Sequence, residues 1–502
     1  MSALDNFKSL SGSLFIDGAF KASASTLRLP VFNPATEDKI GEIADATAAE
    51  IADAIVISSQ AQKRWNAINM LTRAEALHAV ASEVRRLRPM LAEMMTREMG
   101  KPYKESFDEV SWCVSAIDYY AEIARHENGK IVGPTVDGQL HFVIKEPLGV
   151  VAIILPFNYP LVLLVWEAAA ALAAGNSVII KPSELTSLTT LKFMDVFSPL
   201  PAGLVQCITG GATAGRLLVE SDGVHGVAFT GGIATGRAVA KACAETFKRC
   251  LIEASGNDPF IVMPSAPVEI AARGAAFASF LNCGQVCTSA ERLYVHSDIH
   301  DAFADALVTE ARKLRIGNGL EPVELGPMVT EKERSRYERI LARAREQGAT
   351  VRTGGGRPAD FNRGWFVEPT VLTGVTPDMD IINDESFGPV APICRVNSLD
   401  EAIMLANRSR YGLGANIYTG SLDEAMRAVN EIEAGMVWVN APLLDNAAGP
   451  FGGRKLSGTG RQLGSEGLDQ FRHTKFAMID AKASAQDFWW FPYDDKEAFK
   501  TS

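Results

Sequence analysis

Between Val150 and Ser255 the chain alternates short runs of β-branched residues with helical stretches, and this alternation limits its fold more than any other feature. The runs read VVAIILP, SVIIKPS, LVQCITG, HGVAFTGG and RCLIEAS. Continuous apolar runs of this length are typical of strands that are buried on both faces of a parallel sheet. The segments between them, such as Trp166 to Ala174 and Ala234 to Thr246, are long enough for crossover helices. The pattern therefore predicts an α/β fold with a doubly wound parallel sheet.

A second α/β series follows the first along the chain. The runs PFIVM and ERLYVHS are strand-like, and helical stretches end at Phe280 and span about His300 to Leu314. Before the first series the chain is mainly helical from Ala48 to His126, and 129–145 has the pattern of an extended hairpin. Because two strands alone are marginally stable in water, we expect this hairpin to be an arm that pairs with other strands.

Length and composition indicate the class of protein. A chain of 502 residues with 47% apolar residues can bury more surface than one small core needs, so two or three domains are expected. A net charge of −11 argues against nucleic acid or an anionic membrane as the main partner. Residues 1–20 lack a basic stretch followed by an apolar run, and no apolar segment is long enough to span a bilayer, so we expect a cytoplasmic protein. A small-molecule partner fits this balance.

The cysteines give little evidence for disulfides or metal. Seven cysteines are scattered along the chain, without CxxC or Cys/His spacing, which predicts reduced thiols and no metal site. Cys287 ends the run Gly-Gln-Val-Cys at a junction between a helical stretch and a strand, where reactive groups are often held. A lone cysteine is usually a small buried hydrophobe. No histidine stands close to Cys287 in sequence, so a cysteine–histidine hydrolase lacks support, although pairing in space stays open. Cys283 either fills space or forms a disulfide with Cys287 on oxidation.

Other candidate residues stand where predicted strands end. Glu253 ends the apolar strand that begins at Arg249, and the run Leu-Pro-Phe-Asn-Tyr-Pro with Asn158 ends another strand. Charged residues at the ends of parallel strands tend to face the ligand crevice, and an amide donor there can hold an oxyanion. The alternative for Glu253 is a solvated strand end.

Two further strand ends have features of a nucleotide site. The turn from Phe229 to Gly236 is rich in glycine and leads from a strand into a helix, where backbone N–H groups can receive phosphate. Its spacing is GxxxxG rather than the usual GxGxxG. Lys181 and Glu184 close another strand and could bracket a ribose; a surface ion pair is the alternative.

Taken together and in order, these motifs resemble the aldehyde dehydrogenase superfamily over nearly the whole chain. LPFNYP, KPSE, FTGG, the Glu253 segment, GQVC, ESFGPV, YGLGANIY, PFGGRKLSG and GRQLG occur in the family's order. The interval from Glu253 to Cys287 also matches the family. The resemblance implies a coenzyme-binding domain (1–128 and 148–254), a catalytic domain (255–471) and a small β arm (129–147 and 472–486) used in homodimers or homotetramers. Residues 487–502 are expected to form an aromatic C-terminal tail that docks onto its own or a neighbouring subunit.

The resemblance also implies roles for these residues. Cys287 would attack an aldehyde, and the amide of Asn158 with the Cys287 N–H would hold the oxyanion of the thiohemiacetal. After hydride transfer to the cofactor, water activated by Glu253 would hydrolyse the thioester. The cofactor is NAD, with NADP possible, and Glu184 favours NAD because it would repel a 2′-phosphate. The residues implied for cofactor binding are Pro156, Phe157, Lys181, Ser183, Glu184, Thr230, Gly231, Gly232, Gly236, Glu385 and Phe387.

Some positions depart from the family's pattern. The run Ala-Ser-Gly-Asn ending at Asn257 replaces the common Leu-Gly-Gly-Lys, and Gly232 replaces a common serine. Glu167 stands where lysine is common, and Gln462 replaces an acidic residue. The nucleophile, the base and the oxyanion donor are retained, but these changes make an analogy of substrates unsafe.

The resemblance aligns Trp166, Asp445 and Phe451 with the substrate pocket. Asp445 falls where an aromatic residue often stands. An acid at this position fits a cationic aldehyde of the amino- or betaine-aldehyde type, and a hydrogen bond to neighbouring residues is the alternative.

Two other functions stay open at this point. In the CoA-acylating branch of the superfamily the thioester passes to coenzyme A, but its members typically lack the glutamate at the position of Glu253. A non-catalytic structural relative is the other, and the presence of Cys287, Glu253 and Asn158 argues against it.

Overall fold

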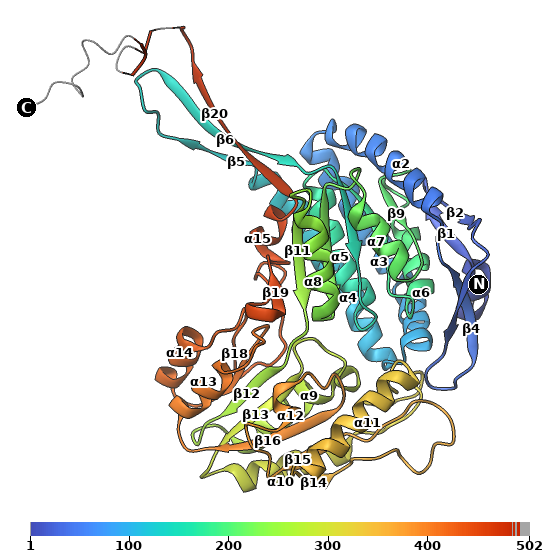
Figure 1. Cartoon of the computed structure of the whole chain (residues 1–502), viewed down its shortest axis with the longest axis vertical. Helices are drawn as coiled ribbons and strands as arrows, with labels where there is room; N and C mark the ends of the chain where they lie inside the picture. Colours follow the sequence, from blue (N-terminus) through green and yellow to red (C-terminus); the bar gives the residue numbers. More distant parts are fainter. Residues whose placement is uncertain (1, 484, 487–488, 492–502) are drawn as a thin grey trace, which may run out of the picture.

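The computed structural model describes residues 2–483, 485–486 and 489–491. The parallel sheet expected from the sequence lies at the centre of the first of two α/β lobes (Figure 1). The sheet's parallel strands pair in the order β11-β10-β7-β8-β9, so the strand order reverses between β7 and β10. They are β7 (Val150–Ile154), β8 (Ser177–Lys181), β9 (Val205–Cys207), β10 (Gly226–Gly231) and β11 (Arg249–Ala254). In doubly wound sheets, ligands bind at the carboxyl ends of the strands beside such a reversal. The predicted fold class is confirmed.

Antiparallel strands extend this sheet at both edges. β1 (Ser13–Ile16) joins β9 and pairs with β2 (Ala19–Ala22), while β19 (Gly458–Thr459) pairs with β11. The N-terminal segment also contains α1 (Ala3–Leu10) and the hairpin of β3 (Arg28–Phe32) and β4 (Lys39–Ala44).

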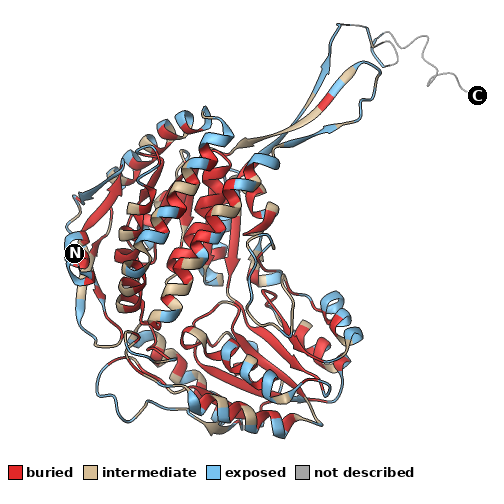
Figure 2. Ribbon diagram, turned by 180° about the vertical axis from the view of Figure 1, so that it is seen from behind, coloured by how far each residue is buried: buried red, intermediate tan, exposed pale blue. Residues whose placement is uncertain are grey.

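Helices cover both faces of the sheet. Val151 and Ile153 of β7 join an apolar cluster with residues of α3 to α6, whereas Val150 and Ala152 join a cluster with residues of α2, α7 and α8. This alternation is the strand periodicity of two. Figure 2 shows the buried interior of the lobe, and α5 is buried along its whole length. The helices are α2 (Ala48–Asn66), α3 (Met70–Met99), α4 (Tyr103–His126), α5 (Pro160–Ala173), α6 (Ser187–Phe193), α7 (Ala212–Glu220) and α8 (Ile233–Ala244).

The second α/β series forms a second lobe with its own apolar cluster. Its strands pair in the order β14-β15-β16-β13-β12-β17-β18; β14 runs antiparallel to β15 and the other pairs are parallel. The strands are β12 (Asp258–Val262), β13 (Ala290–His296), β14 (Thr350–Thr353), β15 (Thr370–Thr373), β16 (Val390–Val396), β17 (Asn416–Tyr418) and β18 (Trp438–Val439). The helices are α9 (Val268–Phe280), α10 (His300–Lys313), α11 (Glu331–Glu346), α12 (Asp380–Asn383), α13 (Leu399–Asn407) and α14 (Leu422–Glu431). The expected boundary at 254–255 falls between β11 and β12, and the division into domains stays a prediction.

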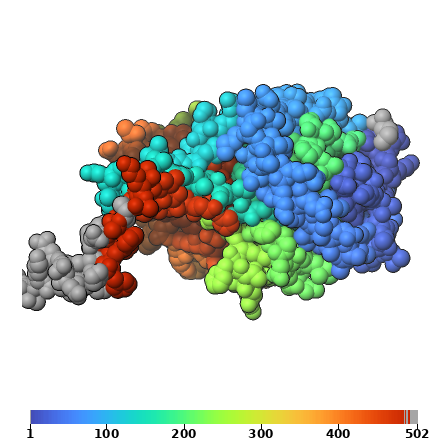
Figure 3. Space-filling model, turned by 90° about the horizontal axis from the view of Figure 1, so that it is seen from above, coloured from blue at the N-terminus to red at the C-terminus, as the bar shows by residue number. Residues whose placement is uncertain are grey.

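An arm projects from the first lobe. β5 (Gly129–Val132) and β6 (Gln139–Pro147) form the expected hairpin, and β20 (Arg472–Asp480), which follows α15 (Gly464–Asp469), pairs antiparallel along β6. The red strand β20 lies at the opposite end of the molecule from the dark blue N-terminal segment (Figure 3). The hairpin therefore pairs with the segment after α15, as expected.

Some expectations concern features that the structure does not test. Within the described residues, no helix is long and apolar enough to cross a membrane, and no group of His, Cys, Asp and Glu side chains could hold a metal ion. Most of the tail 487–502, which was expected to dock on a subunit, lies outside the described residues.

Candidate active site

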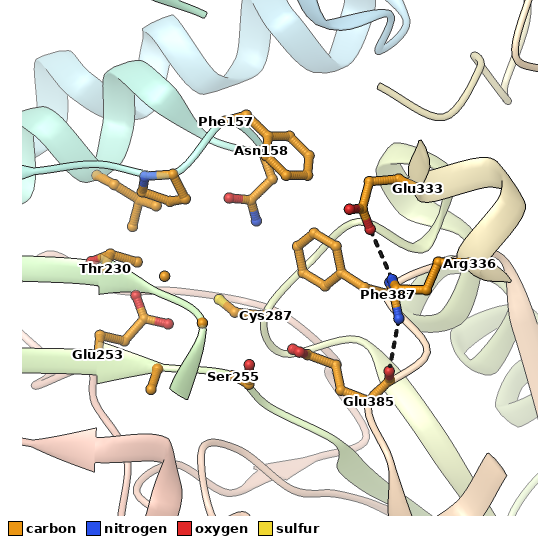
Figure 4. Close-up of a pocket in the computed structure, with 15 residues that line it drawn as sticks. Phe157, Asn158, Thr230, Glu253, Ser255, Cys287, Glu333, Arg336, Glu385 and Phe387 are labelled. Atoms are coloured by element: carbon orange, nitrogen blue, oxygen red, sulfur yellow. Dashed lines mark hydrogen bonds and ion pairs between the residues drawn. The ribbon is translucent and has the colours of Figure 1, made fainter. Parts of the chain in front are cut away.

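A cavity of about 320 Å³ lies where the carboxyl ends of β7, β10 and β11 face the second lobe (Figure 4). Most of the candidate residues line it together. From the sequence prediction these are Pro156, Phe157, Asn158, Thr230, Gly231, Gly232, Glu253, Cys287, Glu385 and Phe387. The cavity is also lined by Leu163, Ala254, Ser255, Glu333 and Arg336, which were not predicted. Trp166, Asp445 and Phe451 line a second, narrower cavity that shares Leu163 and Cys287 with the first. The Cys287 thiol thus lies where the two cavities meet.

The chain before Cys287 is held in a left-handed turn. Asn282 and Cys283 have φ angles of 50° and 56°, a conformation that side chains rarely adopt. The side-chain amide of Asn282 donates to the carbonyl oxygens of Asn158 and Gln285, both at 3.2 Å. Gly256 packs against this segment so closely that a Cβ atom there would lie 1.8 Å from the carbonyl oxygen of Cys287. These contacts fix the backbone that carries the thiol.

Asn158 lies in the loop between β7 and α5 and faces the same cavity. Its side-chain amide donates to the carbonyl oxygen of Gln285 at 3.1 Å, and the residue is 3% exposed. An amide group has a second N–H, so it can also donate to an oxyanion formed at the neighbouring Cys287.

Glu253 is buried rather than solvated, so the alternative of a solvated strand end is wrong. It is 2% exposed and lies beside Thr230 in the parallel register of β10 and β11. Burial raises the pKa of Glu253 to about 7, although the neighbouring Cys287 thiol and Thr230 hydroxyl lower it. Burial, together with the adjacent negative charge of Glu253, raises the pKa of the Cys287 thiol well above its ordinary value. The resting site therefore holds a neutral thiol next to a carboxyl group that titrates near neutral pH.

Two of the positions that depart from the family's pattern, Glu167 and Gln462, are hydrogen-bonded neighbours next to Thr230. The Gln462 side-chain amide donates to the Glu167 carboxyl group at 2.7 Å and to the Thr230 hydroxyl at 3.2 Å, and that hydroxyl donates to Glu167 at 3.3 Å. Burial raises the pKa of Glu167 to about 8. Asn257, another of these positions, donates its side-chain amide to the carbonyl oxygen of Ile382. A network of neutral and acidic groups thus replaces the common lysine and acid.

The far wall of the cavity comes from the second lobe. The Glu385 carboxylate accepts from the N–H of Gly256 at 3.1 Å. The Arg336 guanidinium contacts Glu333 and donates to the carbonyl oxygens of Glu385 and Ser386, two of which contacts are drawn in Figure 4. The sequence analysis missed Glu333 and Arg336 because an acid and an arginine three residues apart on a polar helix have the pattern of a surface ion pair.

The narrower cavity has aromatic walls and an acidic mouth. The rings of Trp166 and Phe451 are 5.0 Å apart, and those of Trp112 and Tyr159, which were not predicted, are 6.4 Å apart. Although Asp445 meets solvent at the mouth, the surrounding protein raises its pKa to about 7 by desolvation. No hydrogen bond to the Asp445 carboxyl group is found among the described residues, and its charge contributes to the raised pKa values of the Cys287 thiol and the Tyr159 hydroxyl. The expected alternative of a hydrogen bond to a neighbour therefore finds no support.

The other predicted cofactor residues, Lys181, Ser183, Glu184 and Gly236, do not line the cavity at the ends of β7, β10 and β11; Gly236 lies in the first turn of α8. Lys181 is buried at the tip of β8, Glu184 is exposed three residues later, and neither forms an ion pair with a described residue. Gly232 precedes α8, whose N-terminus has no side-chain cap, and a Cβ atom at Gly232 would meet no atom within 4 Å. The free N–H groups of α8 can therefore receive a phosphate group, so the residues present fit a dinucleotide.

Comparisons with known proteins agree with this arrangement. Residues 20–477 match the family model described as the aldehyde dehydrogenase family. The chain is 37% identical to a chloroplastic aminoaldehyde dehydrogenase of Arabidopsis thaliana, over 92% of this chain and 95% of the relative. It is 36% identical to a peroxisomal aminoaldehyde dehydrogenase of Pisum sativum, over 95% and 97%. The crystal structure of betaine aldehyde dehydrogenase from Staphylococcus aureus with NAD⁺ superposes with a TM-score of 0.93 at 32% identity, over 97% of this chain and 98% of that one.

The protonation state of Cys287 can be measured by alkylation with iodoacetamide, followed by peptide mass spectrometry. Because the pKa of this thiol is raised above its ordinary value of 9.0, the alkylation rate should still be rising above pH 9. Glu253→Gln removes a negative charge and should shift the curve to lower pH. The buried Cys283, whose sulfur lies 3.7 Å from that of Met328, is the internal control and should stay unmodified. A plateau below about pH 8 would mean that the thiol is already ionised at rest, contrary to this account.

Proposed function

Because the chain belongs to the aldehyde dehydrogenase family and oxidises an aldehyde to the carboxylic acid with a nicotinamide cofactor, we propose that Cys287 is the nucleophile, Glu253 the hydrolytic base and Asn158 the oxyanion donor. The observation that carries this assignment is the position of the Cys287 thiol where the cavity at the strand ends meets the aromatic one, next to a buried carboxyl group. One cavity suits a cofactor and the other suits an organic substrate.

The residues divide the reaction into acylation and deacylation. In acylation, the Cys287 thiol gives its proton to a base, ionised Glu253 or water, and its sulfur bonds to the aldehyde carbon, so that the carbonyl oxygen becomes an oxyanion. The Asn158 amide and the Cys287 N–H donate to that oxyanion. When bound, the nicotinamide accepts the hydride from this carbon, which leaves a thioester on Cys287. In deacylation, ionised Glu253 takes a proton from water, whose oxygen attacks the thioester and releases the acid and the thiol.

The retained base distinguishes this pathway from transfer to coenzyme A. Glu253 lies beside the thiol with a pKa near 7, so a large fraction is ionised at neutral pH and can activate water. A non-catalytic role is excluded by the membership of the chain among enzymes that oxidise aldehydes.

For the cofactor, we assign the phosphate groups to the free N-terminus of α8 and the adenine ribose to Lys181, Ser183 and Glu184. Glu385 and Phe387 would hold the nicotinamide end, and the Phe387 ring meets that of Phe157 edge to face at 5.9 Å. NAD is preferred over NADP, because the Glu184 carboxylate can accept from a 2′-hydroxyl group but repels a 2′-phosphate.

Variants at Cys287 and Glu253 separate the two half-reactions. Cys287→Ser should abolish activity. Glu253→Gln should retain a pre-steady-state burst of NADH near one per active site, because only hydrolysis needs an activated water. General-base catalysis contributes about 10²–10⁴-fold, so steady turnover of Glu253→Gln should fall by at least roughly 10²-fold. A slower burst would indicate that Glu253 also deprotonates the thiol. Full steady turnover of Glu253→Gln, or activity of Cys287→Ser equal to the parent enzyme, would contradict the assignment.

We propose cationic aldehydes, with an ammonium or trimethylammonium group, as the substrate class. Aromatic faces attract such cations, and a carboxylate at the mouth adds a full negative charge. The rings of Trp112, Tyr159, Trp166 and Phe451, with Asp445, line one cavity with the Cys287 thiol. The names of the relatives, aminoaldehyde and betaine aldehyde dehydrogenases, support the same class.

Asp445 can be tested with betaine aldehyde and its uncharged isostere, 3,3-dimethylbutanal. Asp445→Asn should raise KM about tenfold for the cation, equivalent to about 1.4 kcal/mol, and leave KM for the isostere nearly unchanged. Because the pKa of Asp445 is raised to about 7, the carboxyl group gains its charge as pH rises through 7. The kcat/KM for betaine aldehyde, divided by that for the isostere, should therefore rise with pH through 7 in the parent enzyme and stay constant in Asp445→Asn. Equal effects on both substrates would remove Asp445 from substrate recognition.

We further propose that the protein forms homodimers or homotetramers through the arm, and that it is cytoplasmic. Exposed apolar side chains lie on both faces of the arm: Ile131, Leu140 and Ile479 on one face, and Phe476 and Met478 on the other. Exposed apolar side chains that gather on one element mark sites of association. Plant relatives named as chloroplastic or peroxisomal leave the location as a proposal.

Light scattering tests the association. The parent protein should have a mass of two or four 54.0 kDa chains at micromolar concentration. Ile131→Ser with Phe476→Ser should shift it toward the monomer, whereas Leu71→Ser, at an exposed position on α3, should not. A monomeric parent protein would refute the proposal.

A further inference from the structure

Lys101 and Glu109 form an ion pair that is closed to water on both sides. Their ammonium and carboxylate groups are in direct contact, and both side chains are 0% exposed. In every other ion pair found among the described residues, at least one side chain keeps contact with solvent. Desolvation of two charges costs several kcal/mol per ion unless further hydrogen bonds satisfy them. The further groups that hydrogen-bond to Lys101 and Glu109 therefore indicate which part of the structure this ion pair stabilises.

Glu109 caps the helix that follows the oxyanion loop. One of its carboxylate oxygens accepts from the N–H groups of Leu161 at 2.8 Å and Val162 at 3.1 Å, in the first turn of α5. Tyr159, the residue at the N-cap position, provides no side-chain cap. A negative charge at a helix N-terminus satisfies free N–H groups and stabilises the helix dipole. Glu109 thus fixes where α5 begins.

Lys101 holds the two residues that precede α5. Its ammonium group donates to the carbonyl oxygen of Asn158 at 2.8 Å and lies 3.9 Å from the centre of the Tyr159 ring. With Glu109, these contacts account for the three N–H groups of the ammonium. The side chain of Asn158 reaches the carbonyl oxygen of Gln285, two residues before Cys287. The buried pair is therefore one contact away from the oxyanion donor and from a wall of the aromatic cavity.

We propose that Lys101 and Glu109 are positioning residues, whose buried ion pair holds the amide of Asn158 where it can donate to the oxyanion on Cys287. Neither residue lines the Cys287 cavity, so both act through Asn158. Displacement of a reacting group by about 1 Å can cost 10²-fold in rate. The inference rests on the proposed role of Asn158.

The test measures the rate of the NADH burst at saturating NAD in a double-mutant cycle. Lys101→Met removes the ammonium and should slow the burst at least about tenfold. In an Asn158→Ala background the same substitution should have little effect, because its route to the oxyanion is already lost. If Lys101→Met instead caused a general loss of structure, its fold-decrease in burst rate would multiply with that of Asn158→Ala. A burst of Lys101→Met within about twofold of the parent, or full multiplication in the cycle, would overturn the proposal.

Glu98→Gln is the matched control. Glu98 is buried, and it accepts from the N–H groups of Leu188 and Thr189, both at 2.8 Å, in the first turn of α6. It therefore makes the same kind of cap as Glu109, on a helix that does not lead from Asn158. Glu98→Gln should lower the thermal midpoint as Glu109→Gln does but leave the burst rate within about twofold.

Glu109→Gln decides the question if Lys101→Met does not fold, because glutamine keeps an acceptor for α5. It should slow the burst in the parent background and not in Asn158→Ala, and a burst that slows equally in both would overturn the proposal. If Asn158→Ala alone leaves the burst unchanged, then the proposed oxyanion role itself fails. That result is distinct from a failure of the positioning role, in which Asn158→Ala slows the burst and the pair variants do not.

Discussion

The parallel pairing of β10 with β7 and β11 is the constraint on which the active site depends. It brings the carboxyl ends of these strands to one edge, places Thr230 beside Glu253 and starts α5 and α8 at the same crevice. The second lobe then has to supply only the thiol and the far wall. In a doubly wound sheet, strand ends that are far apart along the chain thus meet at one cavity, whose walls carry different chemical groups.

Burial of acidic groups is the second physical theme of the site. Glu253 and Glu167 have raised pKa values because burial disfavours their charged forms. Since the folded protein binds their protons more tightly than the unfolded chain, these groups make the protein less stable as pH rises from 4.5 toward 7 or 8. Hydrolysis at neutral pH thus requires the ionised form of Glu253, which the fold disfavours, while the contacts around Asn158 and Cys287 stabilise the backbone of the site.

The sequence predicted the features that a local pattern of residues encodes, and it missed the contacts that arise only when distant segments pack together. β-Branched runs gave the strands of the first sheet, and strand ends gave Asn158, Glu253 and the glycine turn. Trp112 was missed because no motif links α4 to the thiol. Tyr159 stands in the LPFNYP motif but was missed because the motif does not show that its ring lies beside that of Trp112. The proximity of Glu167 and Gln462, 295 residues apart, appears only after the segment that leads into α15 packs on α5. Lys101 and Glu109 carry no sequence signal either, since eight residues apart on helical segments they have the pattern of ordinary surface charges.

The central claim, a covalent intermediate on Cys287, can be observed by mass spectrometry. The enzyme with NAD and a cationic aldehyde is quenched in acid during turnover, digested, and searched for the acyl group. The account predicts an adduct with the mass of the acyl group, lost on treatment with hydroxylamine, on the peptide that contains Cys287. An enzyme that forms NADH and acid while this peptide stays unmodified under all quench times, or carries the adduct on another residue, would contradict it.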